Sequence, residues 1–298
     1  MENQKNSLFF KNLFSVKKRT LFSGFLAILG TIFVIAAQYQ VSSLSITPPE
    51  HTQYKSVVFD LGDVLVTTSK SVQRNIFFPT ILKNPSLLYH LIGSDIKATF
   101  FDLLSQIPAS STTPIYNKGQ AMPLIMTDWM VGKKSLTQLR LLAHQQIQQS
   151  SYPIAVKQLL IEISHFMFNA QSLAQSQVAI EPMITLAKKL KNAGYKIYIL
   201  SNWDPYSFEF AKQAFPQIFD LCDGMVISGY EQMAKPDDAI FCRLINIYDL
   251  NPQECIFIDD EPYNIAAAQK FGFTAILQVN PTLTCKELIK CGIMTLTA

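Results

Sequence analysis

The sequence predicts an α/β fold whose core is a parallel sheet, with an inserted helical cap and an N-terminal transmembrane helix. Three observations support this prediction. After residue 180, short β-branched segments alternate with amphipathic helical segments, which is typical of parallel strands joined by crossover helices. A long stretch with few strand signals interrupts this alternation. An apolar run of 17 residues lies near the N-terminus.

The composition is that of a globular protein whose charge is unevenly placed. The chain has 298 residues, of which 49% are hydrophobic and 16% charged, and this excludes a wholly disordered protein. Residues 1–19 hold five of the 25 basic and one of the 22 acidic residues, so the rest of the chain has no basic excess. We therefore expect no nucleic-acid partner. Five cysteines are too few for a disulfide framework in a chain of this length.

Residues 20–37 form the predicted transmembrane helix. No charged residue lies between Arg19 and Glu50, and the run from Leu21 to Ala37 is apolar on every face. The basic residues before it predict a cytoplasmic N-terminus, with the rest of a single-pass membrane protein on the far side. Two alternatives stay open: a cleaved signal peptide, which would leave a secreted or periplasmic protein, and a segment of neither kind.

The remaining chain divides into a linker, a core and a cap. Residues 38–53 are polar and contain a pair of prolines, which is typical of a linker. We assign residues 54–69 and 181–298 to a Rossmann-like α/β core. Residues 70–180 contain Leu-rich and Gln-rich helical runs with few strand signals, and we assign them to the helical cap.

The predicted core elements follow the apolar periodicity. Strands are predicted over residues 54–59, 195–200, 224–227, 255–258 and 273–277. Helices are predicted from residue 181 to the glycine at 194, over residues 207–215, from Pro236 to Ile247, and over residues 264–271. Ligands of such sheets bind beyond the carboxyl ends of the strands.

Polar residues that suit phosphate chemistry follow these strands: Asp60, Ser201, Asn202, Lys235, Asp259 and Asp260. Carboxylates that converge at one sheet edge repel one another unless a cation binds. Oxygen ligands with open water positions suit Mg²⁺. The lysine and the metal together would hold a dianionic phosphate, and a pinned carboxylate would act as the nucleophile. The sequence therefore indicates phosphoryl transfer on a small phosphorylated metabolite.

This order of motifs resembles the haloacid dehalogenase (HAD) superfamily. The resemblance is carried by VVFDLGDVLV from Val57, YILSN from Tyr198, MAKPD from Met233 and FIDDEPYNI from Phe257. The insertion also falls where that family places a helical cap. The most similar subgroup contains bacterial sugar-phosphate phosphatases and the N-terminal phosphatase domain of soluble epoxide hydrolase. The resemblance implies a hydrolase, specifically a Mg²⁺-dependent HAD-like phosphatase.

The resemblance implies roles for the residues around the metal. Asp60 is the nucleophile, which forms an aspartyl-phosphate, and it is also a metal ligand. The backbone carbonyl of Gly62 is a second metal contact. Asp260 ligates Mg²⁺ directly, and Asp259 supports the ion directly or through water.

The resemblance likewise implies a set of phosphate contacts. Ser201 and Lys235 bind the phosphate, and Lys235 also offsets the charge on Asp60. Asn202 orients the substrate or the phosphate.

Two further positions have alternative interpretations. Asn264 either ties the metal loop together or merely begins the following helix. In the cap, one interpretation is that Asp128-Trp129 reaches the active site. The other is that Trp129 packs in the cap core.

One position departs from the family pattern. Most phosphatases of the family carry a second Asp two residues after the nucleophile as general acid and base, and here that place is Gly62. Asp63 lies one residue further, and the alternation of an extended chain would aim it elsewhere unless the loop restores its position. We expect slow turnover or a preference for good leaving groups, such as anomeric sugar phosphates or aryl phosphates.

Three functions are compatible with these residues. The first is the phosphatase that acts through Asp60. The second is a hydrolytic dehalogenase of the same fold, in which Asp60 attacks carbon; that chemistry needs no metal, so the Asp259-Asp260 pair argues against it. The third is a membrane-tethered, non-catalytic binding domain, which the departure at Gly62 keeps open.

Overall fold

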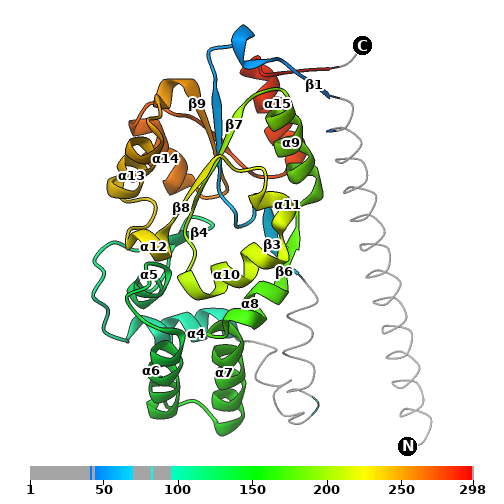
Figure 1. Cartoon of the computed structure of the whole chain (residues 1–298). Helices are drawn as coiled ribbons and strands as arrows, with labels where there is room; N and C mark the ends of the chain where they lie inside the picture. The colour runs from blue at the N-terminus through cyan, green and yellow to red at the C-terminus, as the bar shows by residue number, and fades with distance from the viewer. Residues whose placement is uncertain (1–40, 42–43, 70–81, 83–94, 297–298) are drawn as a thin grey trace, which may run out of the picture.

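The computed structural model describes residues 41, 44–69, 82 and 95–296. Figure 1 shows an α/β core with a helical cap beside it. The predicted transmembrane segment at residues 20–37 lies outside the described residues, so the membrane location stays a prediction. Within the described ranges, no helix has the length and apolar character needed to span a bilayer.

The core is a five-stranded parallel sheet with the order β10-β9-β2-β7-β8. Its strands are β2 (Ser56–Phe59), β7 (Lys196–Ser201), β8 (Gly224–Ile227), β9 (Cys255–Asp259) and β10 (Thr274–Leu277). The strands contain mostly β-branched and aromatic residues that are buried on both faces, as parallel strands between helices require. The predicted parallel α/β sheet is confirmed.

Helices cover both faces of the sheet, which gives a three-layer core (Figure 1). Side chains alternate along β2: Val57 and Phe59 pack with α9 and α15, while Val58 packs with α13 and α14 on the opposite face. These helices are α9 (Glu181–Asn192), α13 (Asp238–Tyr248), α14 (Pro262–Lys270) and α15 (Pro281–Lys290). The crossovers bring the carboxyl ends of the strands to one edge.

The remaining core elements are short. They are η1 (Pro49–His51), α10 (Pro205–Ala214), α11 (Pro216–Phe219), α12 (Ser228–Glu231) and η2 (Pro252–Glu254). A two-stranded sheet pairs β1 (Leu44–Ile46) with β11 (Met294–Leu296). Leu44 is 3% exposed and packs in the core, so the segment expected as a linker contributes a strand there. Polar flanking residues and prolines hid this three-residue strand in the sequence.

The cap has its own apolar core and joins the main core through two strands. β3 (Val66–Thr68) pairs with β6 (Gln177–Ala179) where the chain leaves and re-enters the core. Between them lie α4 (Ile96–Ser105), β4 (Tyr116–Asn117), β5 (Gln120–Ala121), α5 (Leu124–Met130), α6 (Leu136–Gln149), α7 (Ile154–Met167) and α8 (Ala170–Ser176). The predicted helical insertion is therefore confirmed for the described part of the cap.

Asp128 and Trp129 serve the cap rather than the active site. Asp128 is fully buried and accepts hydrogen bonds of 2.6–2.9 Å from the backbone amides and hydroxyls of Ser110 and Ser111. These bonds lower the pKa of the Asp128 carboxyl against the effect of its burial, which raises it. Trp129 packs edge-on against Phe168 in the cap core. Of the two readings of this dipeptide, the structure supports cap packing.

Two histidines face each other between α6 and α7. The ring centroids of His144 and His165 are 4.7 Å apart, and the buried Nε2 of His144 has no hydrogen-bond partner among the residues that the structure describes. Burial, and then the charges of His165 and Arg140, lower the pKa of His144 below its ordinary 6.5. The folded cap therefore binds this proton more weakly than the unfolded chain does.

We expect the His144 pair to make the protein less stable in mild acid. The pKa of His144 is lower in the folded state than in the unfolded chain, so the unfolded chain takes up this proton first as the pH drops below about 6.5. The free energy of unfolding therefore falls below that pH, whereas above it His144 does not change the stability with pH. The His144→Gln variant should lose less Tm than the wild type between about pH 7.5 and about pH 5.5. His51→Gln, at an exposed position, is the control and should behave like the wild type. Equal pH dependence in His144→Gln and the wild type would contradict this prediction.

Candidate active site

Three carboxylates converge at the carboxyl edge of the sheet. Asp60 follows β2, and Asp259 and Asp260 lie at the end of the neighbouring β9. One ligand atom from each lies within 4.8 Å of the others. Asp60 is 8% exposed and Asp259 is fully buried, while Asp260 is partly exposed. The prediction that the ends of separate strands gather acids into one site is consistent with this geometry.

The Lys235 ammonium lies between two of these carboxylates. Its Nζ donates to Asp259 Oδ2 at 2.6 Å and to the backbone carbonyl of Leu200 at 2.7 Å. It also forms an ion pair with Asp60 Oδ1 at 2.9 Å. With 1% exposure, Lys235 is a cation held inside the protein by two anions. Burial lowers its pKa, but the charges of Asp259 and Asp60 outweigh burial and raise the pKa overall.

Ser201 and Asn202 reach the same site in different ways. Ser201 is buried at the end of β7, and its hydroxyl interacts with the Asp60 carboxylate. The side chain of Asn202 brackets the backbone of Lys235: its Oδ1 accepts from the Lys235 amide and its Nδ2 donates to the Lys235 carbonyl, both at 2.8 Å. Asn202 therefore positions Lys235, and its contact with substrate stays a prediction.

The two adjacent aspartates have different surroundings. Asp259 Oδ1 accepts from the backbone amide of Glu261 at 2.8 Å, and both carboxylate oxygens accept from Asn264 Nδ2 at 3.0–3.1 Å. No hydrogen bond reaches the Asp260 carboxylate from the described part of the chain. Asp260 therefore has lone pairs available for a cation, whereas Asp259 is held by protein donors. Asn264 ties the loop together, which was one of its two predicted roles.

The electrostatics of the three acids favour a bound cation. Burial raises the pKa of Asp60 against the lowering effect of Lys235, and nearby Asp259 raises it further. Burial, and then the charges of Asp60, Asp259 and Asp63, raise the pKa of Asp260 to about 8. Ionising all three groups together is costly because one ammonium cannot neutralise three carboxylates.

These residues fit a divalent metal ion. The donor set is all oxygen, the three ligand atoms are close together, and within the described ranges the buried Asp60 Oδ1 accepts no hydrogen bond. Hard oxygen donors of this kind are preferred by Mg²⁺, which keeps some of its waters. Asp60 and Asp260 would hold the ion, and Asp259 would support them; the backbone carbonyl of Gly62 stays a predicted ligand.

The loop after β2 places Gly62 and Asp63 differently. A Cβ on Gly62 would lie 3.9 Å from Asp60 Oδ2, so this position faces the Asp60 carboxylate and has room for a side chain. Asp63 is exposed, has a φ of 50° and accepts a hydrogen bond from the Thr67 hydroxyl. Asp63 lies near enough to raise the pKa of Asp260, but its carboxylate is engaged with Thr67.

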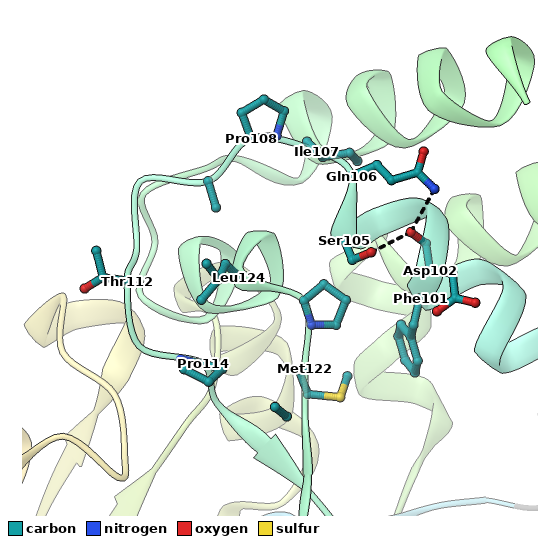
Figure 2. Close-up of a pocket in the computed structure, with 13 residues that line it drawn as sticks. Phe101, Asp102, Ser105, Gln106, Ile107, Pro108, Thr112, Pro114, Met122 and Leu124 are labelled. Carbon is teal, nitrogen blue, oxygen red and sulfur yellow. Dashed lines mark hydrogen bonds between the residues drawn. The ribbon is translucent and has the colours of Figure 1, made fainter.

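A separate cavity of about 730 Å³ lies in the cap (Figure 2). It is lined by residues between Phe101 and Leu124, from α4, α5 and the segments that join them, and Ala121 of β5 belongs to its wall. In Figure 2, Ser105 and Gln106 donate to the Asp102 carbonyl at its edge. None of the three clustered acids lines this cavity, so it is not the site of the chemistry described above.

A comparison with known protein families identifies the family of this chain. Residues 54–272 match the family described as haloacid dehalogenase-like hydrolase. The chain belongs to this family. Its α/β core, inserted helical cap and strand-end acids are the features from which the resemblance was first inferred.

Individual relatives cover less of the chain. A sesquiterpene phosphatase, astK, of Aspergillus oryzae is 31% identical over 106 residues, 36% of this chain and 54% of that protein. The (S)-2-haloacid dehalogenase 4A of Burkholderia cepacia is 29% identical over 89 residues, 30% of this chain and 38% of that protein. The chain thus spans about half the length, or less, of these relatives.

The fold has a solved counterpart. The structure of a predicted HAD-like family hydrolase from Porphyromonas gingivalis superposes with a TM-score of 0.50 and 19% identity, covering 80% of this chain and 99% of that one. At this identity the likeness concerns the fold alone.

The sequence located the core of the site but missed Glu261. Each of the six predicted side chains at strand ends lies at or next to the cluster. Glu261, in contrast, is 3% exposed and accepts hydrogen bonds from the backbone amide of Gly119 in the cap. Its position directly after the acidic pair was the one available signal, and nothing in the sequence indicated a contact across 142 residues.

We predict that Lys235→Met destabilises the protein strongly in the absence of metal. Removing one member of a buried ion pair leaves uncompensated charge, and here two carboxylates would face each other. The free energy of unfolding should fall by about 3–5 kcal/mol, measured by urea denaturation in EDTA. Lys196→Met is the matched control, since Lys196 also pairs with an aspartate but is 61% exposed, and this variant should stay near wild-type stability. Equal losses of unfolding free energy in the two variants would contradict the stabilisation of Asp60 and Asp259 by the buried Lys235 ammonium.

Proposed function

We propose that the protein is a Mg²⁺-dependent phosphatase that hydrolyses a small phosphate monoester through an aspartyl-phosphate on Asp60. The observation that carries this proposal is the buried Lys235 between Asp60 and Asp259, beside the cation-ready Asp260. This arrangement gathers positive charge around a nucleophilic carboxylate, as phosphoryl transfer requires. The family membership and the sesquiterpene phosphatase relative also support it.

The first step forms a bond between an Asp60 carboxylate oxygen and phosphorus and breaks the phosphorus–oxygen bond to the leaving group, whose oxygen keeps the electron pair. Lys235 holds Asp60 in place and offsets the charge on the phosphate. A bound magnesium ion would supply further electrostatic neutralisation of carboxylate and phosphate. In the second step water attacks phosphorus and the phosphorus–oxygen bond to Asp60 breaks, which releases the Asp60 carboxylate and inorganic phosphate. One proton of the water stays on the phosphate and the other leaves to solvent.

Three lines of support bear on the substrate class. The subgroup resemblance points to sugar phosphates, and the loss of an acid at Gly62 favours good leaving groups such as anomeric or aryl esters. The relative from Aspergillus oryzae is named for a sesquiterpene substrate. A panel of glucose 1-phosphate, p-nitrophenyl phosphate and farnesyl phosphate therefore tests polar, aromatic and long apolar leaving groups.

The alternative function is a hydrolytic dehalogenase, in which Asp60 attacks carbon and halide leaves. The Burkholderia cepacia relative favours it. The three converging acids weigh against it, because attack on carbon needs no metal. The two functions separate by assay: phosphate release that EDTA stops supports the phosphatase, and halide release from a 2-haloacid that EDTA does not affect supports the dehalogenase.

We predict that Asp60→Asn abolishes phosphate release while the fold persists. The amide has the shape of the carboxylate but is too weak a nucleophile to form the covalent intermediate. The expected result is a loss of at least about 10³ in kcat with p-nitrophenyl phosphate, with an unchanged circular dichroism spectrum. Asp220→Asn, on an exposed turn, is the control and should retain full activity. Substantial turnover by Asp60→Asn would reject the covalent mechanism.

We also predict that Gly62→Asp increases turnover of esters with poor leaving groups. The Cβ of the added side chain would lie 3.9 Å from Asp60 Oδ2, and Gly62 has no positive φ that would strain a side chain. Because a positioned general acid contributes about 10²–10⁴, kcat for an alkyl phosphate should rise by about 10². Gly62→Asn is the isosteric control that cannot donate a proton as an acid.

The outcome also tests Asp63. If Gly62→Asp gives no more activity than Gly62→Asn, the missing acid is not what limits turnover. A large loss in Asp63→Asn would then identify Asp63 as the group that protonates the leaving oxygen, despite its bond to Thr67.

A further inference from the structure

A hairpin of the cap reaches the core beside the acidic cluster. Strands β4 and β5 pair Tyr116 with Ala121 and Asn117 with Gln120. The two turn residues, Lys118 and Gly119, have φ values of 52° and 75°, the backbone twist of a tight two-residue hairpin. The turn exposes the Gly119 amide, which lies 3.1 Å from each carboxylate oxygen of Glu261.

Glu261 is a buried carboxylate without a cationic partner among the described residues. It is 3% exposed, and in the described part of the chain its side chain accepts hydrogen bonds from Gly119 alone. A buried, unpaired carboxylate is costly, so a residue that merely begins α14 would not need one. The hydrogen bonds from the hairpin account for the burial of the Glu261 carboxylate.

A second contact joins the same two elements. The rings of Tyr116 on β4 and Tyr263 on α14 stack with centroids 3.8 Å apart and an interplanar angle of 17°. Tyr263 is 46% exposed, so the stack forms at the surface, next to the buried Gly119–Glu261 contact. We refer to these two contacts, Gly119–Glu261 and Tyr116–Tyr263, as the hairpin latch.

The latch is directly connected to the acidic cluster. The backbone amide of Glu261 donates to Asp259 Oδ1 at 2.8 Å, while its side chain accepts from Gly119. Glu261 also follows Asp260, whose carboxylate lies within 4.8 Å of Asp60 and Asp259 ligand atoms. The tip of the hairpin is therefore two hydrogen bonds away from the catalytic carboxylates.

We propose that Glu261 is a positioning residue that fixes the cap hairpin beside the catalytic cluster and thereby selects the leaving group of the substrate. The phosphate binds the core, so the rest of the ester must share space with the tip at residues 117–120. A held tip limits which leaving groups fit and gives those that fit a rigid surface to contact. This inference rests on the proposed phosphatase function.

The test compares two substrates that differ only in what lies beyond the phosphate. Acetyl phosphate has a leaving group too small to need the hairpin, whereas p-nitrophenyl phosphate has a large one. In Glu261→Ala, we expect kcat/KM for p-nitrophenyl phosphate to fall by about tenfold and for acetyl phosphate by less than about twofold. Glu261→Gln keeps an acceptor oxygen and should fall between Glu261→Ala and the wild type.

Tyr116→Leu provides a second variant that leaves the loop at Asp259 and Asp260 untouched. It should show the same substrate-dependent loss as Glu261→Ala, though a smaller one. Tyr152→Leu is the matched control, because Tyr152 is 38% exposed in the turn before α7, and it should leave both substrates unaffected. Equal losses on both substrates in Glu261→Ala would overturn the inference, since they would mean that Glu261 acts through Asp259.

Hydrogen–deuterium exchange tests the latch without any assay of activity. Exchange of the Gly119 amide should be faster in Glu261→Ala than in the wild type and unchanged in Tyr152→Leu. Unchanged exchange at Gly119 in Glu261→Ala would overturn the latch itself. If the wild type hydrolyses neither phosphate, the proposed function fails, and the exchange data still decide whether Glu261 holds the hairpin.

Discussion

The buried ammonium of Lys235 is the interaction on which the arrangement of this site depends. It joins residues from the ends of three strands and the loop after a fourth: Asp60, Leu200, Asp259 and Lys235 itself. Two hydrogen-bond acceptors and a second carboxylate surround the ammonium, which restricts the positions of all these groups. The burial of Asp60 and Asp259 is tolerable because this cation lies between them, and the Asn202 amide holds the cation's backbone in turn. With all three acids ionised, the single ammonium leaves two negative charges unbalanced, and a divalent metal ion would neutralise them.

The sequence predicted the core of the fold and of the site because both depend on local patterns. Buried parallel strands appear as short apolar runs, and their carboxyl ends must meet at one sheet edge whatever the exact connections are. Asp60 and Asp259 could therefore be placed together before any coordinates were known. The strand β1 escaped prediction because its three residues carry no pattern of their own and acquire a partner only when β11 lies beside them.

Contacts across the cap could not be predicted on the same grounds. Asp128 is of a residue type that is common in active sites. Its four hydrogen bonds nevertheless hold the backbone around Ser110 and Ser111. Glu261 has the appearance of a helix-start residue, yet its carboxylate meets a cap amide. In both cases the partner is a backbone group presented by a loop, and backbone groups have no signature in the sequence. Tertiary position alone distinguishes a carboxylate that organises a loop from one that performs chemistry.

The departure at Gly62 and the hairpin latch concern the same part of the reaction. In the proposed phosphatase, the core would supply the nucleophile, the cation and the phosphate contacts, so residues buried at the sheet edge would set the chemistry at phosphorus. Nothing at Gly62 can protonate the oxygen that departs, which makes the identity of the leaving group decisive for the rate. A cap element held within two hydrogen bonds of the acids would, under the proposed function, control which leaving groups come near. A site that lacks an acid for poor leaving groups gains from a cap that excludes them, because unproductive esters then do not occupy the phosphate site. Selection by the cap and the missing acid in the core are thus two parts of one physical arrangement.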